Sequence, residues 1–225
     1  MLVPTIGDLL PVAIGVALSP VPIITIVLML GTPRARANGP AFALGWILGL
    51  VVVAAIVLLI AGGADDPDSA ASDGANWFKV LIGVLFLALA VKQWRSRPRP
   101  GEEPELPAWM ATIDTFTPGK SFGLGALLSG ANPKNLALTA AAGASIAQAG
   151  LDTGGQVVAV AAYVVLASLT VAGPVVAYLV ATDRTSKPLA AIKEFMAAHN
   201  AVIMMVVLLI LGLKVLGQGM SGLAT

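Results

Sequence analysis

Six long apolar runs divide this 225-residue chain. An α-helix needs about 20 predominantly apolar residues to cross the hydrocarbon core of a bilayer, and most of these runs reach that length. Charged residues make up 11% of the chain, against about 25% in an ordinary soluble domain, and the mean hydropathy is +0.90. The sequence therefore predicts an all-α integral membrane protein with six transmembrane helices. The predicted spans are residues 7–30, 41–62, 77–91, 122–147, 157–181 and 201–216.

The placement of basic residues predicts the orientation of such a bundle. Ten of the 13 Lys and Arg residues lie in or beside three loops, residues 32–38, 95–120 and 182–200, whereas the opposite side holds Lys79 alone. Because short cytoplasmic loops carry the excess of positive charge, we expect these three loops in the cytoplasm and both termini outside. The two remaining lysines, Lys134 and Lys214, fall inside predicted spans.

Prolines interrupt the first predicted span of each half of the chain. Pro20 and Pro22 lie in "ALSPVPIITIVLML", and Pro133 lies in "SGANPKNLAL". Proline lacks an amide donor and clashes with the carbonyl four residues earlier, so the pair should release the carbonyls of Val16 and Leu18. In a membrane, broken helix is tolerated only where protein buries it or where it lines a cavity. We therefore expect both breaks to lie in such a place.

The two halves also resemble each other in their order of spans. Each half has three spans, and the closing spans "FLALAVKQ" and "LILGLKVL" both place a lysine after an apolar stretch. An odd number of spans inverts the second half relative to the first, a recurring plan of secondary transporters. The sequence predicts two inverted three-helix repeats with proline-broken first helices, at residues 1–94 and 121–225. A cytoplasmic linker loop at residues 95–120 joins them.

Lys134 is the most informative ionisable residue because it lies near the middle of a predicted span. A lysine at that depth costs about 2.5 to 3.5 kcal/mol on insertion scales, and such residues are functional candidates. No Asp or Glu lies in the interior of any predicted span. Two interpretations remain open: the ammonium binds an anionic ligand, or it is structural and binds carbonyls that the prolines release.

The inverted repeat would bring the two breaks together as one polar pocket at the middle of the membrane. Breaking a helix exposes backbone donors and acceptors there, where a polar headgroup could bind. The alternative is that the prolines only kink the helices for packing. The candidate residues for substrate binding and transport are Ser19, Pro20, Pro22, Asn132, Pro133, Lys134 and Asn135.

Two glycine-containing stretches in other spans suggest mechanical roles. Gly173 and Pro174 are hinge candidates in the fifth span, with an ordinary kink as the alternative. Gly45 and Gly49 in "GWILG" match a small-residue helix-packing motif. They predict close packing within the protomer, with a homodimer contact as the other possibility.

The sequence contains no recognisable catalytic or cofactor-binding constellation. There is no cysteine and a single histidine, His199, which excludes disulfides, thiolate metal sites and multi-histidine metal sites. No nucleophile has a plausible histidine and carboxylate partner, and no glycine loop for phosphate is present. We therefore expect no enzymatic activity, no cofactor and no metal, and a net charge of +1 gives no reason to expect a nucleic-acid partner.

"SPVP", "NPKN" and six hydrophobic spans around a charged central loop resemble the lysine exporter (LysE) superfamily. "ALSPVPIITIVLMLGTPRARANGPAFALGWILG", "NPKNLALTAAAGASIAQAG" and the tail "HNAVIMMVVLLILGLKVLGQGMSGL" are similar to its glycolipid-addressing branch in actinobacteria, the GAP or sulfolipid-addressing proteins. The resemblance implies a multi-pass transporter of the bacterial inner (plasma) membrane that helps to move a glycolipid toward the cell surface. Amino-acid exporters of the superfamily usually have glycine between the two prolines, where this chain has Val21.

We therefore expect a secondary transporter or exporter of an anionic amphiphile, such as an envelope glycolipid. Two alternatives stay open: a non-transporting membrane scaffold for a lipid synthesis or export complex, and a small-molecule exporter for amino acids. The expected partners are the lipid or amphiphilic substrate and membrane lipids. A homodimer and partner proteins of lipid synthesis or export are further possibilities.

Overall fold

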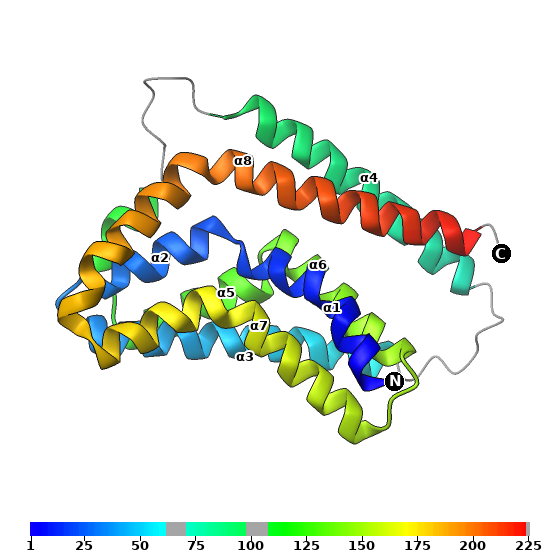
Figure 1. The fold of residues 1–225 in the computed structure, drawn as a ribbon, viewed down its shortest axis with the longest axis horizontal. Helices are drawn as coiled ribbons and strands as arrows, with labels where there is room; N and C mark the ends of the chain where they lie inside the picture. The colour runs from blue at the N-terminus through cyan, green and yellow to red at the C-terminus, as the bar shows by residue number, and fades with distance from the viewer. Residues whose placement is uncertain (62–70, 98–107, 224–225) are drawn as a thin grey trace. The chain divides into compact units, whose positions relative to one another are not determined.

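A computed structural model describes residues 1–61, 71–97 and 108–223 of the chain, and every regular element within them is a helix (Figure 1). The all-α fold class is therefore confirmed for the described residues. Each predicted span falls on one helix or on a broken pair of helices. The elements in chain order are α1 (Leu2–Ala17), α2 (Pro20–Leu30), α3 (Ala35–Ala61), α4 (Ala71–Arg95), the 3₁₀ helix η1 (Ala108–Thr115), α5 (Pro118–Gly130), α6 (Pro133–Gln148), α7 (Thr153–Val180) and α8 (Thr182–Leu223).

The chain divides into two compact units. The main unit comprises Met1–Gly62 and Pro104–Ala198, and the α4–α8 unit comprises Gly63–Glu103 and His199–Thr225. Helix α8 contributes its first part to the main unit and the rest to the α4–α8 unit. Each unit takes residues from both halves of the sequence, and the inverted repeats at 1–94 and 121–225 remain a prediction.

Both predicted helix breaks are present in the main unit. Helix α1 ends at Ala17 and α2 begins at Pro20 with a bend of 57°, seen in Figure 1 in dark blue. Helix α5 ends at Gly130 and α6 begins at Pro133. Proline suits the first position of a helix, because its fixed φ is helical and an N–H there would have no helical partner. The prolines therefore begin α2 and α6 as well as interrupting the spans.

Helices α3 and α5 pack with their backbones in close contact. A Cβ atom at Gly45 would overlap the Phe122 carbonyl, and one at Gly125 would overlap the Phe42 carbonyl. At Gly49 a Cβ would lie 2.9 Å from the Ala126 carbonyl oxygen. Small residues allow this approach where larger side chains would separate the helices. Close packing within the protomer, predicted from "GWILG", is confirmed.

The helices of the two halves interlock within the main unit. Helix α1 packs against α7, and α5 packs against α3. Helix α2 also contacts α7, α6 also contacts α3, and α3 and α7 contact each other. Each broken span of one half therefore lies against the second span of the other half.

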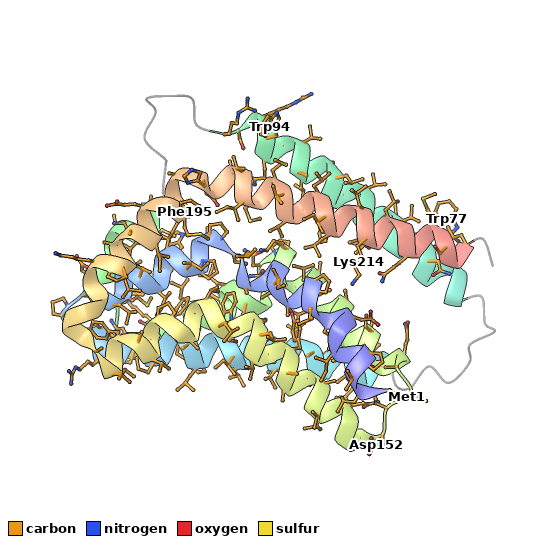
Figure 2. The ribbon with its side chains drawn as sticks, in the orientation of Figure 1. Met1, Trp77, Trp94, Asp152, Phe195 and Lys214 are labelled. Carbon is orange, nitrogen blue, oxygen red and sulfur yellow. The ribbon has the colours of Figure 1, made fainter. Side chains whose placement is uncertain are left out.

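The α4–α8 unit is a pair of helices that lie side by side (Figure 1). A Cβ atom at Gly83 of α4 would lie 2.7 Å from the Leu216 nitrogen, and one at Gly212 of α8 would lie 3.0 Å from the Leu87 side chain. Figure 2 shows Trp77 and Trp94 toward opposite ends of α4. Both are exposed, and their separation of about 25 Å along a helix suits two interfacial anchors.

Length and apolarity select fewer membrane spans than the six predicted. Within the described residues, Ala35–Ile60, Thr153–Val180 and Lys187–Leu223 qualify, and the bent pair α1 and α2 makes a fourth if it counts as one span. Helices α5 and α6 are 13 and 16 residues long, each too short to cross a bilayer alone. The structure thus supports three or four candidate spans, and the six-span count remains a prediction.

The predicted loop at 182–200 is wrong, because α8 is one helix of 42 residues from Thr182 to Leu223. Its charged residues suggested a loop, but Leu189 and Met196 recur two helical turns apart and are both buried. That spacing places them on one face of an amphipathic helix.

The predicted linker at 95–120 contains η1, which packs against α2. Met110 and Ile113 of η1 are buried, and Asn38 Nδ2 donates to the Phe116 carbonyl at 3.0 Å. Residues 98–107 lie outside the described part of the chain, so the linker prediction is not tested there. From 108 onward the segment is folded against the main unit.

Candidate functional site

The C-terminal end of α1 is completed by side chains from three parts of the chain. The last four carbonyls of a helix have no partner within it. Here the Ile14 carbonyl accepts from the Leu18 amide at 2.8 Å. The next three carbonyls accept from side chains: Gly15 from Lys134 Nζ at 2.8 Å, Val16 from Ser19 Oγ at 2.7 Å and Ala17 from Thr170 Oγ1 at 2.6 Å.

Lys134 stands in the first turn of α6 and extends to the break between α1 and α2. Its side chain is 8% exposed, and Nζ donates to Ser19 Oγ at 2.7 Å as well as to Gly15. Both acceptors are neutral oxygens, and none of the described residues gives this ammonium a carboxylate partner. The α1 carbonyls form the negative end of a helix dipole, which partly compensates a positive charge. Lys134 therefore links the two breaks by a charge-assisted contact.

Ser19 is the centre of this network. Its hydroxyl accepts from Lys134 and lies 2.7 Å from the Val16 carbonyl and 3.0 Å from Asn135 Oδ1, between which its single proton is shared. Ser19 is 4% exposed and Asn135 is 0% exposed. Buried polar groups are costly unless they are hydrogen-bonded. The Ser19 hydroxyl meets this need for groups of α1 and α6 at the start of α2, and so fixes the positions of these three helices relative to one another.

The second break, between α5 and α6, is completed by its own neighbours. Asn135 Nδ2 donates to the Leu128 carbonyl at 2.9 Å, and Asn132 Oδ1 accepts from the Lys134 amide at 3.1 Å. The Leu127 carbonyl accepts from the amide of Ala131 at 2.9 Å. Asn132 is thus the N-cap of α6, the position at which Asn is among the preferred residues.

The structure brings most of the predicted site residues together. Ser19, Lys134 and Asn135 contact one another, and Asn132 fixes the backbone of Lys134. Pro20, Pro22 and Pro133 contribute as residues of the first helical turns. The predicted release of the Val16 carbonyl is confirmed, and Ser19 is its new partner.

The hinge candidates lie apart from this network. Gly173 and Pro174 are inside α7, which continues without interruption from Thr153 to Val180. Thr170, one turn earlier, bonds to the end of α1. Their role as a hinge stays a prediction.

Sequence reasoning missed Gly15, Thr170, Thr139 and Tyr163. Thr139 Oγ1 donates to the Asn135 carbonyl at 2.7 Å and lies 2.9 Å from the Tyr163 hydroxyl. Thr139 is one helical turn after Asn135, and Tyr163 and Thr170 are polar residues in an apolar run. Because hydroxyls in membrane helices bond across to neighbouring helices, these positions carried a usable signal. Gly15 carried none, because only its backbone takes part.

The chemistry of this site suits an anion or a hydroxyl-rich headgroup. It offers one buried ammonium, amide groups and hydroxyls, which together supply hydrogen-bond donors and one positive charge. None of the described side chains that form this site has a carboxylate, imidazole or thiolate group. These side chains therefore do not provide a set of metal ligands.

The sequence of the chain was compared with models of known protein families. Residues 9–221 match the family model SfLAP, described as Sap, sulfolipid-1-addressing protein. The chain belongs to this family. The match spans α1 through α8 and so includes both breaks of this Sap-family chain. No curated protein and no solved structure matches the chain.

Membership in the Sap family agrees with the predicted sulfolipid-addressing branch. The match names the Sap family alone, so membership in the wider LysE superfamily, which the sequence motifs also suggest, stays a prediction. Its apolar helices make the chain a membrane-embedded protein.

Proposed function

We propose that this chain is a membrane transporter that moves an anionic glycolipid, of the sulfolipid class named in the family description, toward the cell surface. The observation that carries the proposal is Lys134, whose buried ammonium contacts only neutral oxygens at the meeting point of two helix breaks. A buried charge is stabilised best by an opposite charge. A monoanionic sulfur-containing headgroup would supply that charge without help from any side chain.

The pairing of helices supports an inverted-repeat transporter as the architecture. The first segment of each broken span lies on the second span of the other half, α1 on α7 and α5 on α3. The second segments also contact these helices, α2 on α7 and α6 on α3, although α2 contacts α3 of its own half equally. A pseudo-two-fold axis between the halves would produce this exchange. Helix breaks that meet at such an axis are the usual binding place in transporters of this plan.

We place this transporter in the bacterial inner membrane with six spans and both termini outside. The ten basic residues that lie in or beside residues 32–38, 95–120 and 182–200 support that orientation, although the last of these segments is helical,. Single cysteines test it cleanly, because the chain has none of its own. Ser96→Cys should react only from the cytoplasm and Ser72→Cys only from outside. The reverse labelling would overturn the orientation.

The transport proposal requires substrate movement by the chain itself. The purified protein would be reconstituted in liposomes with a fluorescent sulfated glycolipid, and an uncharged analogue with the same acyl chains would serve as the comparison. We expect the protein to speed movement of the sulfated lipid between leaflets. Movement only after addition of a lipid-synthesis or export protein would favour the scaffold alternative. Movement of amino acids but not of the lipid would favour the small-molecule exporter.

Two variants test whether Lys134 is the group that recognises the headgroup. Lys134→Met keeps most of the side-chain length and removes the charge, so the inserted protein should lose transport. Lys120→Met makes the same change at an exposed lysine near the start of α5 and should transport normally. A wild-type rate per inserted Lys134→Met molecule would overturn this assignment.

A third variant keeps the lysine and supplies a competing anion. Asn135→Asp places a carboxylate beside the Ser19 hydroxyl that Lys134 also contacts. The new charge would neutralise the ammonium within the protein, so transport of the sulfated lipid should fall although Lys134 is present. Normal transport by this variant would show that the positive charge does not select the substrate.

A further inference from the structure

We infer that the C-terminal end of α1 acts as a surrogate for the substrate's anion: headgroup binding draws Lys134 away from α1, and release of the headgroup returns it. This inference rests on the proposed function and adds how occupancy of the site is coupled to motion of a helix. Its basis is the set of contacts that Lys134 makes with Gly15 and Ser19.

The end of α1 and an anion require the same ammonium. An ammonium has three N–H donors, and Lys134 directs one to Gly15 of α1 and another to Ser19, two residues after the end of α1. The Gly15, Val16 and Ala17 carbonyls are clustered at this helix end. Their dipoles sum to about half a negative charge, so an anion placed beside Lys134 would be repelled by α1. Binding of both at once is therefore unfavourable.

The remaining contacts allow α1 to be released without loss of the rest of the site. Lys134 is held to α6 through its amide, which donates to Asn132, and Asn135 is held to α5 through Leu128. These bonds do not involve α1. When Lys134 moves away, the end of α1 keeps two hydrogen bonds: Ser19 Oγ still donates to the Val16 carbonyl and Thr170 Oγ1 to the Ala17 carbonyl. The hydrogen bonds from Lys134 Nζ to Gly15 and Ser19 are therefore the contacts that an anion would break.

This exchange also addresses the return step of a transport cycle. A carrier that has delivered an anionic headgroup would otherwise hold an uncompensated ammonium within the membrane, which is strongly unfavourable. With α1 as the alternative partner, Lys134 has an acceptor in each half of the cycle. The headgroup that fits this role is monoanionic, since a single ammonium faces it and no second buried lysine or arginine is found among the described residues.

Hydrogen–deuterium exchange in nanodiscs of phosphatidylcholine tests the inference. The probe is octyl sulfate, compared with octyl glucoside, which has the same chain and no charge. Binding is measured separately by isothermal titration calorimetry in wild type and in Lys134→Met. We expect amide exchange in residues 12–19 to rise by roughly tenfold with octyl sulfate, the factor that one lost hydrogen bond to a charged group represents. Octyl glucoside should leave it unchanged.

The outcomes separate this inference from the proposed function. Lys134-dependent binding of octyl sulfate with unchanged or slower exchange in residues 12–19 would overturn the surrogate role and leave the proposed recognition standing. Absence of Lys134-dependent binding would overturn both. Thr170→Val is the matched control, because it removes a neighbouring cap of α1 without removing charge. Its exchange should be higher from the start and should still rise with octyl sulfate.

Discussion

The two helix breaks share a backbone plan but differ in the side chains that complete it. In "SPVP" (residues 19–22) and "NPKN" (residues 132–135), a polar N-cap precedes a proline at the first helical position. Aligned in this way, Val21 occupies the place of Lys134, and Pro22 the place of Asn135. The first break therefore has no polar side chain in its opening turn, whereas the second has two.

This difference determines where each break finds its partners. The carbonyl four residues before the N-cap is Gly15 in the first break and Leu128 in the second, and both accept from side chains of α6. The second break is thus completed from within its own segment. The first depends on α6 and, through Thr170, on α7. The first break can change its conformation when contacts from other helices change. The second break can keep its conformation during such a change, because its contacts lie within its own segment.

The largest expected effect is that of Asn135→Leu, because Asn135 serves both breaks. The substitution leaves the Leu128 carbonyl without its donor and removes one of the two acceptors of the Ser19 hydroxyl, which keeps the Val16 carbonyl. The unpaired Leu128 carbonyl should cost about 1 to 3 kcal/mol and the lost Ser19–Asn135 bond about 0.5 to 1.5 kcal/mol, so the free energy of unfolding should fall by roughly 2 to 4 kcal/mol. Steric trapping in bicelles measures this quantity. Leu136→Ala, at the exposed neighbouring position, is the control, and equal losses from the two variants would contradict the shared role.

Ser19→Ala should be the next largest and should act on the first break alone. It removes an acceptor of the Lys134 ammonium and the donor that the Val16 carbonyl and Asn135 Oδ1 share, with an expected loss of about 2 kcal/mol. Exchange of α1 amides near residue 16 should rise in the same variant, while amides near residue 128 stay protected. A rise at both places would mean that the second break is not self-contained.

The location of the breaks was predictable, whereas the partners within them were not. Proline chemistry in "SPVP" and "NPKN" depends on local sequence, so both interruptions and the freed Val16 carbonyl follow from the sequence alone,. That Lys134 contacts the Gly15 carbonyl depends on how α6 crosses α1. No local rule fixes such a crossing. Both sequence interpretations of Lys134 therefore retain support in part. It binds a carbonyl at the end of α1, although Gly15 is not one that the prolines release, and its charge has no acidic partner among the described residues.

The error at residues 182–200 has a different physical origin. Charge placement predicted a loop, but Leu189 and Met196 bury one face and the segment is helical. Charges on the exposed face of an amphipathic helix look like a loop when only hydropathy is averaged. The seven-residue spacing of the apolar residues Leu189 and Met196 was the signal in the sequence that could have corrected it.

Asn132→Ala should have a smaller effect that is confined to the second break. Loss of an N-cap side chain typically lowers stability by about 1 kcal/mol, and here the Lys134 amide loses its partner. The ammonium of Lys134 keeps both acceptors, so exchange near residue 16 should not change. Steric trapping and amide exchange on the same variant measure both effects. A loss as large as that of Ser19→Ala would contradict the proposed difference between the breaks.

Thr170→Val is expected to have the smallest effect and gives the finest test of how the first break depends on other helices. Valine has nearly the same shape as threonine, so the substitution removes the hydrogen bond to the Ala17 carbonyl with little change in packing. Hydrogen bonds between membrane helices average about 0.6 kcal/mol in double-mutant cycles, and we expect a loss of that order. Combined with Ser19→Ala, the loss should exceed the sum of the single effects, because the two hydroxyls complete adjacent carbonyls of one helix end,. Combined with Asn132→Ala it should be additive, because that cap belongs to the self-contained break. If Thr170→Val were additive with Ser19→Ala but not with Asn132→Ala, α7 would support the second break rather than the first.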